Sequence, residues 1–234
     1  MNTNHIYHAK ILAHICSTNH VELPQTLIYL TINNFQGFYY IDTDSYTNEQ
    51  TLNIFFDGSN EFIDWWDNNL SFRKEKLYIN DVYCGKIHSG FLKYYKNIQK
   101  TFTSLIMQHL DCTQINLYGF SLGSSCIIGA LEISFIDKCP PVFVTTFGSP
   151  PIGDKVFATV YNNRVKNSIR YVNKTDPIPK IPSSLCHVNK QIILGNTKKS
   201  IIQTIKQFFN VKNIVKSHYM DTYCYNLEHF NDVM

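Results

Sequence analysis

The stretch Gly-Phe-Ser-Leu-Gly at residues 119–123 constrains the fold of this chain more than any other. The residues before it, Ile115–Phe120, are mostly β-branched and aromatic and predict a strand, whereas residues 122–136 predict a helix. A turn this sharp brings the backbone on either side of Ser121 close together, so both flanking positions favour glycine. The serine hydroxyl then projects alone at the tip, with the start of the helix behind it. This is the pattern of a nucleophile elbow.

Strand and helix patterns alternate through the middle of the chain. The continuous apolar run 141–148 is typical of a strand buried on both faces of a parallel sheet. Residues 90–110 have apolar side chains at helical spacing. Further strands are predicted at 36–42, 51–58, 168–173 and 187–194, and further helices at 153–163, at 199–209 and in the tail after residue 218. The alternation favours an α/β fold, with a mainly parallel central sheet covered by helices on both faces.

Composition narrows the class of protein. The 234 residues are 44% hydrophobic and 17% charged, which indicates one globular domain spanning residues 1–234. The net charge of +3 comes without a basic cluster, so a nucleic-acid partner is not expected. The longest apolar run, 126–136, is short and contains Gly129 and Glu132, so no transmembrane segment is expected.

The N-terminal residues and the cysteines bear on the cellular compartment. Residues 1–20 lack the pattern of a secretory signal. The seven cysteines are scattered and form no C-x-x-C pair, which favours reduced thiols over disulfides or a zinc site. We therefore predict an intracellular, cytoplasmic protein. Abundant Asn, Ile, Lys and Tyr suggest an AT-rich genome, such as that of a protist or a large DNA virus. If the source is a virus, we expect the protein to be associated with the virion.

A serine nucleophile needs a histidine base, and the base needs a carboxylate to orient it. Asp176 follows the predicted strand 168–173, at the edge where parallel sheets collect their chemistry, although Asp-Pro is also a common turn. Three histidines follow: His187 begins a predicted strand close to Asp176, His229 lies near the chain end, and His218 lies in a loop after a predicted helix. The base is therefore predicted to be His218.

The oxyanion of acyl transfer needs two backbone N–H donors. Leu122, the residue after the nucleophile, is expected to supply one of them. Gly58 and Ser59 follow another predicted strand, and Ser59 is the candidate for the second donor. The alternative for Gly58-Ser59 is an ordinary turn.

Several separated segments together resemble the class 3 lipases, the family of fungal triacylglycerol lipases and their plant and protist relatives. The matching segments are residues 55–72, 86–98, 115–125, 144–154 and 170–182, with 217–223 as a weaker sixth. The resemblance implies an α/β-hydrolase fold. It also implies Ser121 as nucleophile, Asp176 as orienter, His218 as general base, and Ser59 with Leu122 as the oxyanion hole.

The chain departs from the family pattern near the elbow. Phe120 replaces the usual His or Tyr before the nucleophile, which is expected to change packing and leave the triad intact. Asp57 replaces an arginine before the oxyanion loop and removes a cation from the mouth of the site. Ser124 and Ser125 stand where Gly and Ala are common, a mild change.

A short amphipathic segment follows the predicted oxyanion loop. Its apolar face consists of Phe62, Trp65, Trp66 and Leu70. One interpretation is a lid that swings this face onto a lipid surface, as the family resemblance implies. The other is a fixed helix packed on the core.

The leading hypothesis is a serine carboxylester hydrolase acting on lipid acyl esters, with no metal or organic cofactor. Its expected partners are a lipid ester and, peripherally, the surface of a membrane or lipid droplet. The alternatives are a short-chain esterase, an acyltransferase that uses an alcohol in place of water, and a catalytically inactive lipase-like module that binds lipid or protein.

Overall fold

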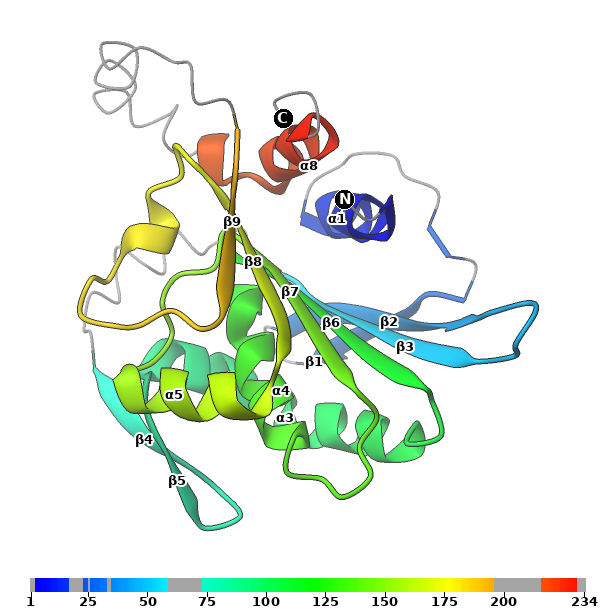
Figure 1. The fold of residues 1–234 in the computed structure, drawn as a ribbon, viewed down its shortest axis with the longest axis horizontal. Coiled ribbons are helices and arrows are strands. Elements are labelled where there is room, and N and C mark those ends of the chain that lie inside the picture. Colours follow the sequence, from blue (N-terminus) through cyan, green and yellow to red (C-terminus); the bar gives the residue numbers. More distant parts are fainter. Residues whose placement is uncertain are drawn as a thin grey trace.

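The computed structural model describes residues 3–16, 23–24, 26–32, 35–58, 73–195 and 216–230. Its centre is a seven-stranded sheet in the order β1-β2-β3-β6-β7-β8-β9 (Figure 1). The strands are β1 (Ile28–Ile32), β2 (Phe35–Thr43), β3 (Gln50–Phe56), β6 (Gln114–Phe120), β7 (Val142–Phe147), β8 (Asn167–Asn173) and β9 (Lys190–Leu194). From β3 to β9 all neighbours are parallel, whereas β1, β2 and β3 pair antiparallel. The predicted mainly parallel sheet is confirmed.

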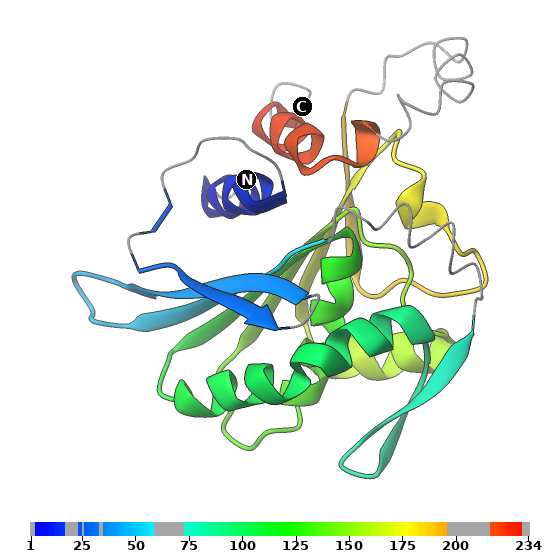
Figure 2. The same ribbon diagram turned by 180° about the vertical axis from the view of Figure 1, so that it is seen from behind.

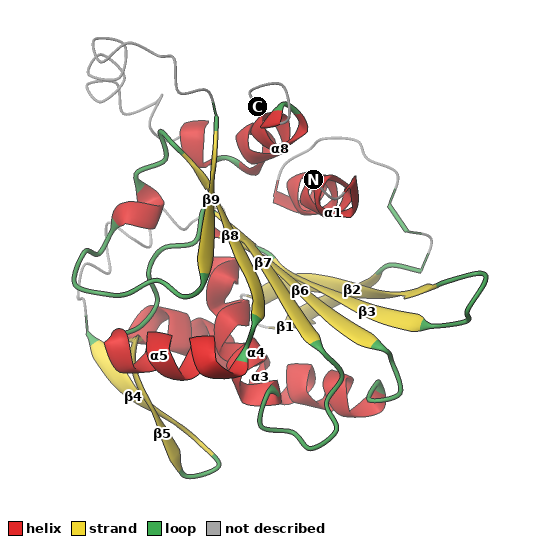
Figure 3. Ribbon diagram, in the orientation of Figure 1, coloured by secondary structure: helices red, strands yellow, loops and turns green. Residues whose placement is uncertain are grey.

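Helices cover both faces of this sheet (Figures 2 and 3). On one face lie α3 (Ser89–Gln108), α4 (Cys126–Ile133) and α5 (Lys155–Arg164). On the other face lie α1 (Thr3–Cys16) and α8 (Met220–Glu228), so the two ends of the described chain pack side by side. Each face therefore has its own apolar core.

The larger core depends on the amphipathic helix α3. Its buried residues recur at helical spacing and are Phe91, Leu92, Tyr94, Tyr95, Ile98, Phe102, Leu105 and Ile106. The Glu132 carboxylate of α4 accepts hydrogen bonds from Tyr95 and Gln99 of α3 at 3.1 and 2.6 Å. These bonds hold α4, the helix that follows the nucleophile, against α3.

The smaller core lies under α1 and α8. His8 of α1 is buried between two tyrosines of the sheet, with Nε2 2.8 Å from the Tyr40 hydroxyl and Nδ1 2.9 Å from the Tyr118 hydroxyl. Its ring stacks on Tyr118 with centroids 4.4 Å apart. No helix is predicted from the sequence of this segment, and the structure shows that it forms α1.

A separate two-stranded hairpin, β4 (Lys74–Ile79) and β5 (Val82–His88), precedes α3. Asn80 and Asp81 form its turn with φ of 47° and 62°, the left-handed pair that a two-residue hairpin turn requires. The segment ends in His88, whose Nδ1 accepts from Gly90 N at 3.1 Å and caps α3.

The structure changes two predicted elements near the site. The helix predicted at 122–136 starts as the 3₁₀ helix η1 (Ser121–Ser125) and becomes α-helical only in α4. The strand predicted at 187–194 starts at Lys190, so His187 lies in a loop and not in a strand.

The helix predicted at 199–209 lies outside the described residues. Within the part of the chain that is described, no helix is both long and apolar enough to cross a membrane.

Candidate active site

The elbow has the geometry that the sequence predicts. Ser121 follows directly on β6 with φ of 52°, a left-handed conformation that is costly for a residue with a side chain. A Cβ on Gly119 would lie 2.4 Å from the Gly123 carbonyl oxygen, and a Cβ on Gly123 would lie 2.1 Å from the Phe56 carbonyl oxygen. Both glycines are therefore required by close backbone approach.

The three predicted triad residues meet at the carboxyl ends of β6 and β8. His218 Nε2 lies 2.8 Å from Ser121 Oγ, and His218 Nδ1 lies 2.8 Å from Asp176 Oδ2. All three residues are buried, with exposed fractions of 1%, 5% and 0% for Ser121, His218 and Asp176. An ionised carboxylate only accepts hydrogen bonds, so Nδ1 carries the imidazole proton. Nε2 can then accept the proton of the serine hydroxyl.

The Asp176 carboxylate is held by two further donors. Ile178 N donates to Oδ1 at 2.9 Å, and the Tyr223 hydroxyl donates to Oδ2 at 2.5 Å. Burial, and then the Asp176 charge, raises the pKa of Tyr223 well above its usual value, so this hydroxyl keeps its proton. Three donors around one buried carboxylate fix its orientation toward His218. Tyr223 belongs to residues 217–223, the segment with the weakest resemblance to the class 3 lipases, and no role is predicted for it from the sequence.

The segment that carries His218 is tied to the end of β8. Asn173 Nδ2 donates to the Ser217 carbonyl at 3.0 Å, and Asn226 of α8 donates to Asn173 Oδ1 at 2.9 Å. Ser217 Oγ donates to the Thr175 carbonyl at 3.1 Å. The residues on both sides of Asp176 and His218 are thus joined by side chains, and Asn173 is a second site residue without a predicted role.

The ring of His218 is confined from two sides. Phe120 packs on it with centroids 5.1 Å apart. Gly148 has φ of 61°, and a Cβ there would lie 2.9 Å from His218 Cε1. Phe120, which stands where the family usually has His or Tyr, thus packs directly on the ring of His218.

Of the predicted oxyanion donors, the structure describes Leu122 and not Ser59. Leu122 is buried in η1, directly after the nucleophile. The strand end that leads to Ser59 lies beside the elbow, because a Cβ on Gly58 would be 2.4 Å from the Phe120 carbonyl. The Tyr94 hydroxyl of α3 donates to the Asp57 carbonyl at 2.7 Å and anchors this strand end. Ser59 and the predicted lid residues Phe62, Trp65, Trp66 and Leu70 lie outside the described residues.

The family model for lipase (class 3) matches residues 53–185, more than half of the chain. This chain is a member of the class 3 lipase family. The match includes the elbow and Asp176, whereas His218 lies beyond it.

Individual relatives agree with this assignment. A secreted mono- and diacylglycerol lipase 2 of Gibberella zeae is 32% identical over an alignment of 112 positions, and the alignment covers 42% of this chain and 28% of that protein. A triacylglyceride lipase structure from Rhizomucor miehei superposes with a TM-score of 0.68 at 20% identity, over 83% of this chain and 80% of that one. A triacylglycerol lipase structure from Penicillium expansum superposes with a TM-score of 0.65 at 17% identity, over 82% of this chain and 79% of that one. The structural similarities establish the α/β-hydrolase fold.

The predicted cytoplasmic location is contradicted by the comparison with the Gibberella lipase, which is a secreted protein. The cysteines misled the prediction. Six free thiols are described, and burial raises the pKa of Cys224 to about 12 and that of Cys126 further still. Such thiols are protonated and unreactive in an oxidising compartment as well as in a reducing one. Cys126 and Cys224 therefore do not distinguish an oxidising compartment from a reducing one.

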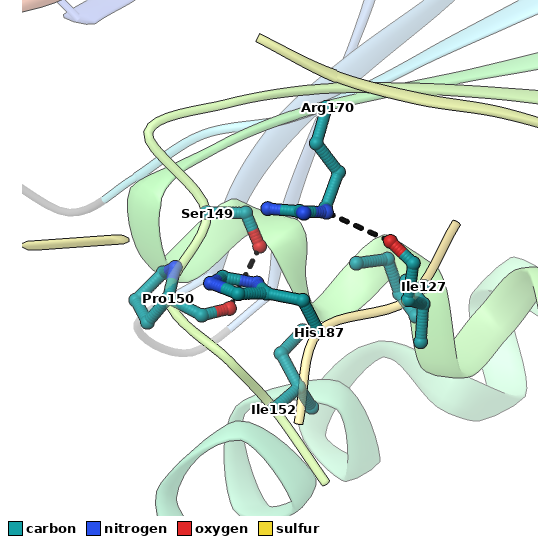
Figure 4. A pocket seen from close by; sticks show the side chains of 7 residues that line it. Ile127, Ser149, Pro150, Ile152, Arg170 and His187 are labelled. Atoms are coloured by element: carbon teal, nitrogen blue, oxygen red, sulfur yellow. Dashed lines mark hydrogen bonds between the residues drawn. The ribbon is translucent and has the colours of Figure 1, made fainter. Parts of the chain in front are cut away.

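A second polar cluster of this class 3 lipase contains Arg170 and His187 (Figure 4), and His187 contacts the loop that follows Asp176. The Arg170 guanidinium of β8 is buried, and its Nε donates to the Val188 carbonyl at 2.7 Å. His187 Nε2 lies 2.6 Å from the Pro179 carbonyl, so Nε2 carries the proton and Nδ1 does not. Arg170 Nη1 and His187 Nδ1 have no hydrogen-bond partner among the described residues. His187 thus contacts the loop of Asp176 through the Pro179 carbonyl.

We expect this cluster to make folding stability depend on pH. Burial, and then the Arg170 charge, lowers the pKa of His187 from 6.5 to about 4. Between these values the unfolded chain binds a proton that the folded chain does not. Lowering the pH from about 6.5 to about 4 should therefore cost up to about 3 kcal/mol of unfolding free energy. The measurement is urea denaturation across this range.

The matched variant is His187→Gln, which can still donate to the Pro179 carbonyl and does not titrate. Burial also lowers the pKa of His88, so the variant should keep part of the pH dependence and lose the larger part. Parallel stability profiles for the two proteins would show that His187 is not the group responsible.

In the described part of the chain, no three His, Cys, Asp or Glu side chains are grouped to hold a metal ion.

Proposed function

We propose that the protein is a serine carboxylester hydrolase acting on acyl esters of lipids. The observation that carries the proposal is the continuous set of hydrogen bonds from Ser121 through His218 to Asp176, in a member of the class 3 lipase family. Acylglycerols are the first substrates to examine, because the relative from Gibberella zeae is a mono- and diacylglycerol lipase. The central sheet draws strands from Ile28 to Leu194, and α1 packs against α8, which supports a single domain.

The proposed reaction has two halves. Ser121 Oγ attacks the ester carbonyl carbon while His218 Nε2 accepts the hydroxyl proton, and the resulting imidazolium is stabilised by Asp176. The tetrahedral oxyanion accepts hydrogen bonds from the backbone N–H of Leu122 and, we propose, of Ser59. Collapse of this intermediate breaks the bond to the alcohol, which takes the proton from His218 and leaves Ser121 acylated.

Water completes the cycle. His218 removes a proton from a water molecule that attacks the acyl carbon, and a second tetrahedral intermediate collapses to release the fatty acid and regenerate Ser121.

Lipid esters collect at membranes and droplets, so we also propose peripheral contact with a lipid surface. The segment with Phe62, Trp65, Trp66 and Leu70 remains the proposed lid, and its sequence pattern supports that role.

The proposal is tested by labelling the protein with a fluorophosphonate probe, with and without detergent micelles, and locating the label by peptide mass spectrometry. We expect the label on Ser121, and we expect it to be lost in Ser121→Ala. A fluorophosphonate reacts with activated serine hydroxyls, so Ser217 beside the triad serves as an internal control and should stay unlabelled. Absence of label in both conditions would contradict the proposal and favour an inactive lipid-binding module.

A further inference from the structure

Three exposed lysines lie close in the chain or by hydrogen bond to the residues that follow β8, where Asp176 and His218 meet. They are Lys174, Lys180 and Lys216. Lys180 Nζ donates to the Lys174 carbonyl at 3.4 Å. Lys216 precedes Ser217, whose hydroxyl reaches the carbonyl of Thr175, the residue after Lys174. The three lysines therefore form one patch beside the triad, which we call the basic rim.

Among the described residues, no ion pair neutralises a lysine of the basic rim. Within the described residues, the ion pairs are Lys10–Glu228 and His218–Asp176, and neither involves a rim lysine. Asp176 is buried and committed to His218. The sequence extends the asymmetry, because the 44 residues from Pro177 to Met220 contain seven lysines and neither Asp nor Glu. All 18 acidic residues of the chain lie outside this stretch, so its charged Lys, Arg, Asp and Glu side chains are all basic.

Exposed apolar side chains flank the same lysines. Tyr219, directly after His218, is 50% exposed, and Ile181, next to Lys180, is 37% exposed. Tyrosine is favoured where one end of a side chain is in an apolar medium and the other in water. Lysines interleaved with such residues match a lipid headgroup layer, which offers negative charge at its surface and apolar volume beneath.

We propose that the basic rim docks on anionic phospholipid surfaces and so places the mouth of the active site at the layer that holds its ester substrates. The inference rests on the proposed lipid-ester activity and adds the kind of surface on which this chain works. Charge complementarity supplies the attraction, and Tyr219 and Ile181 enter the headgroup region. The contact therefore weakens as salt is added, because screening acts on exposed charges.

The test is flotation of the Ser121→Ala protein, which leaves the lipid intact, with vesicles of phosphatidylcholine alone or with about a third phosphatidylserine. We expect binding to the anionic vesicles and little to the neutral ones. Each lysine near an anionic surface is worth about fivefold in affinity, so the triple variant Lys174→Gln, Lys180→Gln, Lys216→Gln should bind at least about tenfold more weakly. The matched control replaces Lys93, Lys96 and Lys100, which are exposed on α3 across the sheet, by Gln and should bind like the parent.

Hydrolysis of a water-soluble short-chain ester, measured in the Ser121 background, separates this proposal from the proposed function. The triple variant should keep that activity, since none of its lysines touches the triad. Inactivity of the unmodified protein would count against the proposed function, whatever the vesicles show. Equal binding by the triple variant and the parent, or equal binding to neutral and anionic vesicles, would overturn the docking proposal.

Discussion

The His218→Ala protein should hydrolyse a soluble ester with a kcat at least about 10⁴-fold below that of the unmodified chain. The structure places His218 Nε2 2.8 Å from Ser121 Oγ. Without the imidazole, no base takes up the hydroxyl proton as the bond to the ester carbon forms, and the serine reacts as an ordinary alcohol. Steady-state hydrolysis of a nitrophenyl ester measures the loss, and circular dichroism confirms that the variant folds.

The matched control for this variant is His187→Gln. His187 is a second histidine near Asp176. It is partly buried, and its Nε2 contacts the Pro179 carbonyl. Because glutamine can keep that contact, kcat should stay within about threefold of the parent value at pH 7. A large loss of kcat in His187→Gln, together with an active His218→Ala protein, would show that the base is His187 and not His218.

The elbow could be predicted because its glycines are required by local backbone geometry. The triad could be predicted because its residues follow a known order along the chain. Close backbone approach requires glycine at Gly119 and Gly123, whatever the rest of the chain does. The order Ser, Asp, His then selects among few candidates once Ser121 is identified.

The residues that support the triad could not be predicted because their partners are distant in sequence. Tyr223 contacts Asp176 across 47 positions, and Asn173 contacts Ser217 across 44. No local pattern distinguishes Tyr223 from the other 14 tyrosines. Only the packing of α8 on β8 brings these side chains to the carboxylate.

The unpredicted elements have similar explanations. In α1 the buried residues include the neighbours His8 and Ala9 and the run Ile11–Ala13, so no single apolar stripe is visible in the sequence. The β4–β5 turn uses Asn80 and Asp81 without the glycine that usually signals such a hairpin. The first turn after the nucleophile is 3₁₀ and begins at Ser121, whose φ is positive, which the apolar pattern of residues 122–136 does not reveal.

Alanine at Gly123 should destabilise the protein by about 3 kcal/mol or more, and it should slow labelling of Ser121 in the fraction that folds. The added Cβ would lie 2.1 Å from the Phe56 carbonyl oxygen and 2.8 Å from that of Asp57. Both contacts are with backbone, which cannot rotate away as the end of a side chain can. Relief requires the end of β3 to move, and Gly58, which packs against the elbow, moves with it. Urea denaturation measures the first effect, and the rate of fluorophosphonate labelling measures the second.

Ser124→Ala, one position further on, is the matched control. The Ser124 hydroxyl is fully buried and has no hydrogen-bond partner among the described residues. Removing it relieves an unpaired polar group and adds no atom, so stability should be unchanged or rise by about 1 kcal/mol, with normal labelling. A Gly123→Ala protein as stable and as reactive as Ser124→Ala would mean that the Phe56 carbonyl does not confine this turn. The glycine requirement from which the elbow was predicted would then be wrong.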